Sequence, residues 1–452
     1  MKEIIQKNFI FIIITTFFIF GSKFLFYKIS SRFNIVLSVD YELTVSILII
    51  AVFVGYSAYN KKINAIVKSF FMIDNSIELF FVIFLFWSLF TGVFGLNPSQ
   101  SIEAVALFML NYILLSKIIN SEIKNVNHLL IVFSMLFWIF LGVVSTTGYI
   151  VVINKIGFNP YVNAGRNGVF FNPNVLGLYS LILFLLSLLL LFNSKKKYMF
   201  ILYYISIAVS IFILLFSGSR TCVAVSILSI IIIAFLFFKA NMREALIHVA
   251  MIVILYLGIS YFLDIDMLRL FFRETNTAVN TVNNTANNIL SPSDIIKTLN
   301  EIKKENLLGS GRMIIWRQLI QYTVDNNLLI GIGIANTEAL STLLLKEVTF
   351  AHSAFIDIFV GTGLIGVILF TCFSGAVLYK LYNLYRLSFD KKLWITFFVL
   401  ALSIIIHSLF ENTINSPTHI IFQIFMLCTA AVKIGDNNIK NSEMLEENEN
   451  KN

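Results

Sequence analysis

Four polar features of this chain contain residue types that bind phosphate or move a proton. Three of them contain arginine, and they occupy residues 163–174 (NAGRNGVFFNPN), 217–220 (SGSR) and 309–317 (GSGRMIIWR). A guanidinium group captures two phosphate oxygens at once, which makes arginine the side chain suited to this anion. The fourth feature is His352, because an imidazole can accept a proton from a sugar hydroxyl at neutral pH. The set is typical of a site that holds a phosphate and activates a hydroxyl.

Each of these residues also has an ordinary structural interpretation. Arg220 follows a tight turn, which is equally typical of a side chain that snorkels to anchor a helix end. Arg312 follows a Gly-Ser-Gly stretch, which indicates either an anion site at a helix start or a hinge with a solvated charge. His352 is either a base or an interfacial histidine that caps a helix, and residue type alone does not separate the two.

Two acidic residues lie near a histidine in the sequence. His407 and Glu411 are four residues apart and therefore share one helical face, a spacing that favours a structural hydrogen bond between helices. Asp357 follows His352 by five positions, which places it about 140° further around a helix. We therefore do not expect Asp357 to orient His352.

No pattern in the sequence is typical of a metal or cofactor site. There is no H-E-x-x-H motif and no carboxylate pair in an outer loop, and Cys222, Cys372 and Cys428 have unrelated spacings inside apolar runs. The cysteines are interpreted as small buried apolar residues. Residues 331–333 (GIG) indicate a turn, because the spacing of a dinucleotide-binding loop is not completed. We expect no metal and no cofactor, so arginines must handle any phosphate chemistry.

The composition excludes a soluble globular protein. Of the 452 residues, 58% are hydrophobic and 13% are charged, whereas globular chains have about 45–50% apolar and about 25% charged residues. About twelve spans of roughly 20 residues would use about 240 positions and leave room for loops and tails. The net charge of +8 follows from the preference of Lys and Arg for the cytoplasmic side of a membrane, so we do not expect nucleic acid as a partner.

Twelve long apolar runs predict an all-α, polytopic bundle of about 12 transmembrane spans. They cover residues 9–27, 43–59, 77–95, 104–119, 129–149, 175–192, 199–216, 221–238, 245–263, 351–379, 393–410 and 420–432. The seventh and eighth runs are separated only by residues 217–220 and are together too long for one crossing. They therefore predict a tight helical hairpin that turns on Gly218.

The distribution of charge predicts which way the spans point. With the N-terminus inside, most Lys and Arg residues outside the long segment 264–350 fall in the inner loops and tails, as the orientation rule requires. Both termini are then cytoplasmic, and the four polar features face the outer side together. Arginines on the outer side run against the usual tendency, which favours a function for them. A cluster of arginines at a lipid surface fits a lipid-linked phosphate or pyrophosphate.

These patterns divide the chain into four parts. Residues 1–263 carry spans 1–9, and residues 264–350 form a large extracytoplasmic loop with short helices. In that loop the apolar spacing of residues 313–324 predicts a helix at the membrane surface. Residues 351–434 carry spans 10–12. Residues 435–452 are rich in Glu and Asn and predict a disordered cytoplasmic tail.

The order of these features resembles the O-antigen ligase and polymerase family of bacterial inner-membrane glycosyltransferases. The resemblance rests on the ordered set of pieces and covers about the C-terminal two thirds of the chain. The pieces are GVFFNPNVLG (168–177), SGSR (217–220), GSGRMIIWRQ (309–318), LIGIG (329–333) and AHSAFIDIFVGTGLIG (351–366). Relatives commonly have His-Asn where this chain has His352-Ser353, so a role for that asparagine is not carried over.

The resemblance implies a multi-pass membrane enzyme whose active site lies on the extracytoplasmic face and works without a metal. Its donor would be an undecaprenyl-diphosphate-linked oligosaccharide. Arg220 and Arg312 would bind the pyrophosphate, and His352 would deprotonate the acceptor hydroxyl. Trp316 would stack on a sugar or anchor the loop. The candidate substrate-binding residues are Arg166, Asn174, Trp316, Arg317 and Glu411.

Three functions are compared. The leading hypothesis is a repeat-unit polymerase for a surface polysaccharide, either O-antigen or capsule. The alternative is an O-antigen ligase that moves glycan to a lipid core or a protein. A flippase or transporter for a lipid-linked sugar ranks below both, because it predicts charged groups deep in the spans, whereas the deep positions here are almost all apolar. Besides membrane lipid, the resemblance allows a chain-length regulator or other polysaccharide-assembly proteins as partners.

Overall fold

The fold was analysed in a computed structural model of the whole chain. The structure describes residues 73, 75–113, 115, 126–157, 173–240, 242–262, 312–345, 351–388, 390–417 and 419–449. Within these ranges every regular element is a helix and there is no strand. The all-α fold predicted from the sequence is therefore confirmed.

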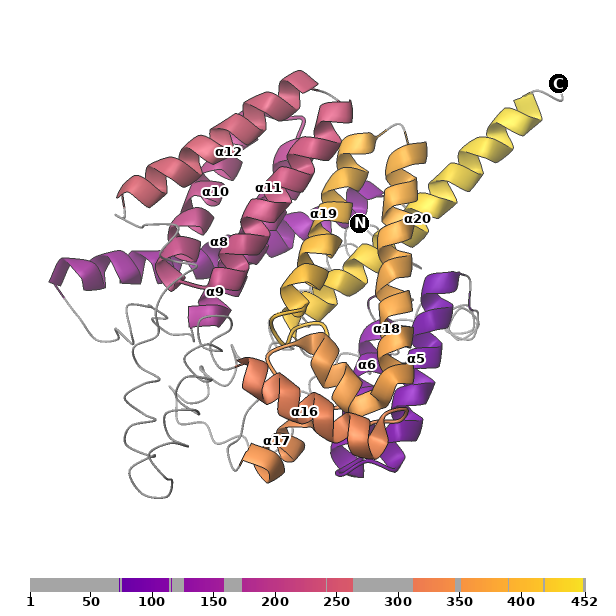
Figure 1. The fold of residues 1–452 in the computed structure, drawn as a ribbon. Helices are drawn as coiled ribbons and strands as arrows, with labels where there is room; N and C mark the ends of the chain where they lie inside the picture. The colour runs from indigo at the N-terminus through magenta and orange to yellow at the C-terminus, as the bar shows by residue number, and fades with distance from the viewer. Residues whose placement is uncertain are drawn as a thin grey trace, which may run out of the picture.

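The described helices form one bundle with a short pair of helices across one end (Figure 1). In chain order they are α5 (Ser76–Val93), α6 (Pro98–Asn111), α8 (Val126–Gly157), α9 (Pro173–Asn193), α10 (Lys197–Ser217), α11 (Arg220–Ala240), α12 (Met242–Phe262), α16 (Arg312–Asn327), α17 (Thr337–Leu345), α18 (Ala354–Leu387), α19 (Lys391–Ser408) and α20 (Ile420–Glu449). The pair across the end consists of α16 and α17.

Eight of the described helices are long and apolar enough to cross a membrane: α5, α8, α9, α10, α11, α18, α19 and α20. They correspond to eight of the twelve predicted spans. The ninth predicted span is the shorter apolar helix α12, and the fourth is represented by α6, which has 14 residues. The first two predicted spans, 9–27 and 43–59, lie outside the described residues.

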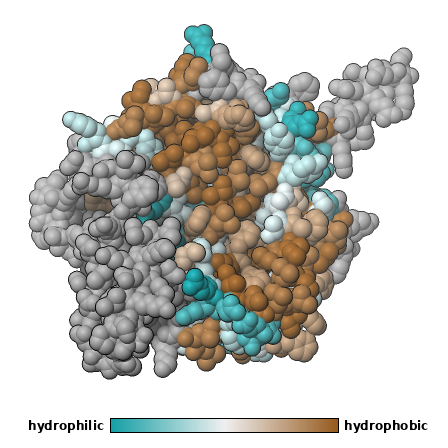
Figure 2. All heavy atoms as spheres, viewed as in Figure 1, coloured by the Kyte–Doolittle hydropathy of each residue, from teal (hydrophilic) through white to brown (hydrophobic). Residues whose placement is uncertain are grey.

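Two surfaces of the bundle differ in character. Large apolar side chains such as Ile231, Phe235 and Ile368 are exposed on α11 and α18, and Figure 2 shows a broad hydrophobic face over this part of the molecule. Below it, a hydrophilic strip follows α16. An exposed apolar face of this size is expected where lipid replaces water, so the strip along α16 marks where the apolar face ends.

Helix α9 is the centre of the bundle. Its sequence from Leu176 to Phe192 is apolar on every side, and its span is almost fully enclosed by other helices, with 94% of it buried. A helix that is hydrophobic all round belongs in the interior of a bundle. The hydroxyls of Ser180 and Ser187 are satisfied by carbonyls one turn earlier, those of Leu176 and Leu183, so the core holds them without partners from another helix.

The predicted hairpin between the seventh and eighth runs is confirmed. Gly218 ends α10 in the left-handed conformation (φ 62°), and its N–H donates to the Leu215 carbonyl at 3.1 Å. Helix α11 then starts at Arg220. A Cβ added at Gly177 of α9 would lie 2.6 Å from the Ser219 Cβ, so α9 packs directly against this turn.

The predicted span 351–379 corresponds to α18, which is not one continuous helix. Within α18, Gly363 has φ 67° and ψ −169°, a conformation that divides the helix. Residues on both sides of the break find hydrogen-bond partners elsewhere: Trp87 Nε1 donates to the Thr362 carbonyl at 2.8 Å, and the Leu364 N–H donates to the Leu328 carbonyl at 2.8 Å. The periodicity of an apolar run does not reveal such a break, because one glycine changes the backbone without changing the pattern.

The turn predicted at residues 331–333 fits into this break. The Ile332 N–H donates to the Val360 carbonyl at 3.0 Å and the Gly333 N–H to the Gly361 carbonyl at 2.8 Å. Glycine is required here, because a Cβ at Gly331 would lie 2.6 Å from backbone atoms of residues 360–363. The first part of α18, residues 354–362, thereby becomes a short half-helix fixed to the loop that follows α16.

At the C-terminus, the structure differs from the disordered tail predicted for residues 435–452. Helix α20 continues to Glu449. It is tied to α18 by the Lys380–Asp436 ion pair (3.2 Å), and the residues beyond include Lys, Glu, Met and Leu, which favour helix. The polar composition after residue 434 therefore does not end the helix.

Candidate active site

Three residues predicted to act in the site meet at one end of the bundle. Arg312 Nη2 donates to Glu411 Oε1 at 2.7 Å, and Arg312 Nη1 donates to the Phe410 carbonyl. The other carboxylate oxygen, Glu411 Oε2, lies 3.7 Å from His352 Nδ1. The three side chains come from the start of α16, the turn before α18 and the α19–α20 loop. Glu411 thus stands between a guanidinium and an imidazole.

The surroundings of Glu411 keep its carboxylate ionised. Only 13% of the side chain is exposed, and burial alone would raise its pKa. The interactions with His352 and with the positive charge of Arg312 outweigh burial and hold the pKa of Glu411 below its ordinary value. An ionised carboxylate beside an imidazole stabilises the protonated form of that ring, which a histidine base needs after it has taken a proton.

Replacing Glu411 with glutamine is expected to lower the melting temperature at pH 7 and to lower it less at pH 4. Because folding lowers the pKa of Glu411, the carboxylate stabilises the folded state fully above its ordinary value of 4.5 and loses this contribution as the pH falls through the lowered folded-state value. Thermal unfolding of both proteins in detergent at the two pH values measures the difference. Asp325→Asn, which removes an exposed carboxylate from α16, is the control. An equal loss at both pH values would contradict this assignment.

The backbone holds His352 in an unusual conformation. Its φ is 53°, in the left-handed region that residues other than glycine rarely adopt. On one side, the Ala351 carbonyl accepts a hydrogen bond from Trp316 Nε1. On the other, Ser353 caps α18, its hydroxyl accepting from the Ile356 N–H at 3.4 Å. The side chain of His352 is 41% exposed, so this arrangement presents the imidazole to the outside.

Trp316 contributes to this arrangement through its indole N–H. The ring packs in a small apolar cluster with Leu319, Leu340, Ala351 and Val360. The sequence left two roles open for Trp316, stacking on a sugar or anchoring the loop. The contact with the Ala351 carbonyl makes it an anchor for the segment that carries His352, and sugar stacking stays a prediction.

Arg220 lies at the same end of the bundle as the three clustered residues. Two residues after it, Cys222 Sγ lies 3.4 Å from Nε2 of His407, and His407 is one helical turn before Glu411. Asn174, in the first turn of α9, is near Arg220 because α9 packs on the α10–α11 turn at Gly177. Half-buried Arg220 and half-buried Asn174 both have interactions within the protein.

Of the remaining predicted residues, Arg317 lies within the described part of the chain and Arg166 does not. Arg317 is exposed on α16, five residues after Arg312 and therefore about 140° around the helix from it. Arg166 lies outside the described residues, as do Gly309, Ser310 and Gly311 of the predicted anion site.

Residues 205–371 match the family model described as O-antigen ligase. The similarity to this family covers less than half of the chain. No curated protein sequence matches the chain. The family resemblance predicted from the ordered motifs is therefore confirmed for a segment that runs from α10 into the second part of α18.

The O-antigen ligase segment contains Arg220, Arg312 and His352 but ends before Glu411. The site is completed from outside the matched segment, by the α19–α20 loop. Within the described residues, no group of three or more His, Cys, Asp and Glu side chains is placed to hold a metal ion. The clustered polar groups suit an anion and a proton instead.

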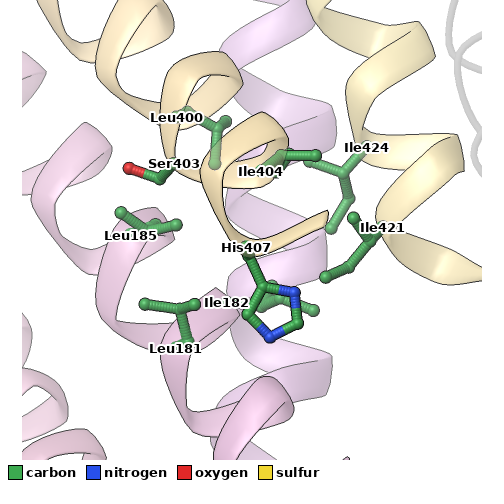
Figure 3. Close-up of a pocket in the computed structure, with 9 residues that line it drawn as sticks. All are labelled: Leu181, Ile182, Leu185, Leu400, Ser403, Ile404, His407, Ile421 and Ile424. Atoms are coloured by element: carbon green, nitrogen blue, oxygen red, sulfur yellow. The ribbon is translucent and has the colours of Figure 1, made fainter. Parts of the chain in front are cut away.

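His407 has the structural role that its spacing favoured, but with a different partner. Its imidazole is buried, and its hydrogen-bond partner is Cys222 of α11 rather than Glu411. Figure 3 shows the ring beside a narrow apolar pocket. The pocket is lined by Leu181, Ile182, Leu185, Leu400, Ser403, Ile404, His407, Ile421 and Ile424. The Cys222–His407 contact joins the start of α11, with Arg220, to the end of α19.

The sequence analysis missed the pairing of Arg312 with Glu411. The two residues are 99 positions apart, and no periodicity connects them. One signal was present: Glu411 is an acidic residue between two apolar spans on the predicted outer side, where an ionised group needs a partner of opposite charge. The three outer arginines were the candidates for that partner.

Proposed function

We propose that this protein is a repeat-unit polymerase for a surface polysaccharide. It transfers glycan from an undecaprenyl-diphosphate donor to a sugar hydroxyl of a lipid-linked acceptor, at the extracytoplasmic face of the bacterial cytoplasmic membrane. The observation that carries the proposal is the position of Glu411 between Arg312 and His352. This arrangement supplies a base, a group that stabilises the protonated base, and a cation for a phosphate.

The reaction is a direct displacement at the anomeric carbon of the donor sugar. The acceptor O–H proton passes to His352 while the acceptor oxygen bonds to the anomeric carbon. The bond from that carbon to the pyrophosphate oxygen breaks, and its electron pair stays on the leaving pyrophosphate. Arg312 and Arg220 offset the charge that develops there, which lowers the energy of the transition state.

Arg312 can bind the donor without leaving Glu411. A guanidinium has five N–H donors, of which Nη1 serves the Phe410 carbonyl and Nη2 serves Glu411 Oε1. Among the described residues no further hydrogen-bond partner of this guanidinium is found, and we propose that its remaining N–H groups bind a phosphate oxygen. Because the protein contacts fix the plane of the guanidinium, these groups have a set direction before the donor arrives.

The second candidate function is a ligase that transfers glycan to a lipid core or a protein. The matching family model is described as O-antigen ligase, and the same base and arginines would serve either acceptor. The choice depends on the acceptor that reaches His352.

A reconstituted transfer assay tests the proposal. Purified protein in liposomes is given undecaprenyl-diphosphate-linked repeat units, and the products are separated by length. A ladder of longer lipid-linked glycans is expected, also in the presence of a metal chelator. His352→Ala is expected to reduce transfer by about 100- to 10,000-fold, the usual contribution of a general base. His128→Ala, which changes an exposed histidine of α8, is the control.

Two results would overturn the assignment. Normal lengthening by His352→Ala protein would remove the histidine from the mechanism. Transfer to a lipid core or protein acceptor, with no lengthening of lipid-linked units, would replace the polymerase by the ligase.

A further inference from the structure

A buried carboxylate, Asp357, lies directly behind the candidate site. It is in the first turn of the half-helix at the start of α18, and only 9% of the residue is exposed. An acidic residue in the first turn of a helix is favoured by the helix dipole. The helix dipole does not require the residue to be buried, so it does not explain why the carboxylate is enclosed by the protein.

The carboxylate of Asp357 is bonded to the loop that carries Glu411. Asn415 Nδ2 donates to Asp357 Oδ2 at 2.9 Å, and Asn415 is four residues after Glu411. A buried hydrogen bond of this kind is costly to leave unmade. It holds the α19–α20 loop against the start of α18.

The backbone of Asp357 is also bonded beside His352. The Asp357 N–H donates to the Ser353 carbonyl at 3.0 Å, and Ser353 is the residue immediately after His352. On the other side of His352, the Ala351 carbonyl is held by Trp316. The backbone is therefore held on both sides of His352, which is what a strained left-handed residue requires.

We infer that Asp357 is a positioning residue that sets the separation of His352 from Glu411. The side chain of Asp357 is bonded to the loop that carries Glu411, and its backbone N–H is bonded to the residue after His352, so Asp357 connects the two members of the 3.7 Å pair. Asp357 does not reach the substrate in this account. The inference adds a positioning residue to the proposed function. The expected effect of Asp357 on catalysis rests on that proposed function.

Three variants test the inference in the transfer assay. Asp357→Ala removes the acceptor for Asn415, and is expected to lower kcat by up to about 100-fold with little change in KM for the lipid-linked donor, because misplacement of a catalytic group by about 1 Å has an effect of this size. Asp357→Asn keeps one oxygen acceptor and is expected to recover much of kcat. Asp325→Asn is the control for loss of a carboxylate on the same side of the molecule.

A second measurement does not depend on glycan transfer. Diethyl pyrocarbonate modifies accessible imidazoles, and mass spectrometry reports the rate at each histidine. In Asp357→Ala protein the rate at His352 is expected to rise severalfold, because the loop that carries Glu411 is released and Glu411 moves away from the ring. The rate at exposed His128 is expected to stay constant and serves as the internal reference.

The two measurements separate the inference from the proposed function. If wild-type protein transfers no glycan but Asp357→Ala raises the modification rate at His352, the proposed function fails and the positioning role stands. If the modification rate is unchanged in Asp357→Ala protein, or if this variant raises KM and leaves kcat intact, the positioning role is overturned.

Discussion

Arg312→Ala is expected to reduce glycan transfer by about 100- to 1,000-fold, the usual effect of removing one preorganised donor of this kind. It is also expected to destabilise the protein by about 3–5 kcal/mol, because it leaves Glu411 as a largely buried charge without its partner. Arg312 and Glu411 are 19% and 13% exposed, so little water reaches the pair to compensate. Transfer rates and thermal unfolding in detergent measure the two effects.

Further variants at these positions separate charge from geometry. Arg312→Lys keeps the charge but cannot reach the Phe410 carbonyl and Glu411 together, so it is expected to recover stability better than activity. The double variant Arg312→Ala with Glu411→Ala is expected to regain stability, because no buried charge is left alone, and to remain inactive. Recovery of activity in this double variant would remove Arg312 from the mechanism.

The control for Arg312 is Arg243→Ala. Arg243 is exposed in the first turn of α12, which begins at the end of the bundle remote from α16 (Figure 1). This variant removes the same side chain from a different surface. Transfer and melting temperature are expected to be close to those of the wild type.

Gly363→Ala is expected to destabilise the fold by about 3–5 kcal/mol. Two causes combine. The φ of 67° with ψ near 180° is a conformation that L-residues other than glycine hardly adopt, and an added Cβ would clash with the backbone carbonyl group of Leu329. The half-helix that carries Asp357 and follows His352 would then be displaced. The yield of monodisperse protein after detergent extraction and its melting temperature check this prediction.

The same helix offers a matched control for Gly363. Gly375 lies in the regular part of α18, is exposed, and has nothing within 4 Å of an added Cβ. Gly375→Ala is expected to be neutral or to stabilise the helix by up to about 1 kcal/mol, since alanine is the better helix former. If Gly363→Ala behaved like Gly375→Ala, the break in α18 would not be required for folding.

The elements themselves could be predicted from the sequence. Apolar runs of about 20 residues exceed what a soluble core needs, and in lipid such runs satisfy their backbone groups only as helices. The hairpin at Gly218 followed from length alone, because two spans had four residues between them. The ordered motifs identified the family, and Arg312 and His352 were selected by residue type and expected side.

The partners of these residues could not be predicted. Apolar periodicity reports which face of a helix is buried, but not which other helix covers it. The bond between Trp87 and Thr362 spans 275 positions, and the Arg312–Glu411 pair spans 99. The angle around a helix excluded Asp357 as a partner of His352, but nothing in the sequence predicted its bond to Asn415, 58 positions away.

The sequence by itself thus determined that the chain is suited to a lipid environment and which segments form helices. It also determined which charged side chains are available on one side. Only the tertiary structure decided that Glu411 lies between Arg312 and His352, that α18 breaks at Gly363, and that Asp357 joins the two segments behind the site. The reason is physical: hydrophobic burial is non-directional and can be read locally, whereas a hydrogen bond or ion pair requires two groups to meet within a few ångströms after the chain has folded.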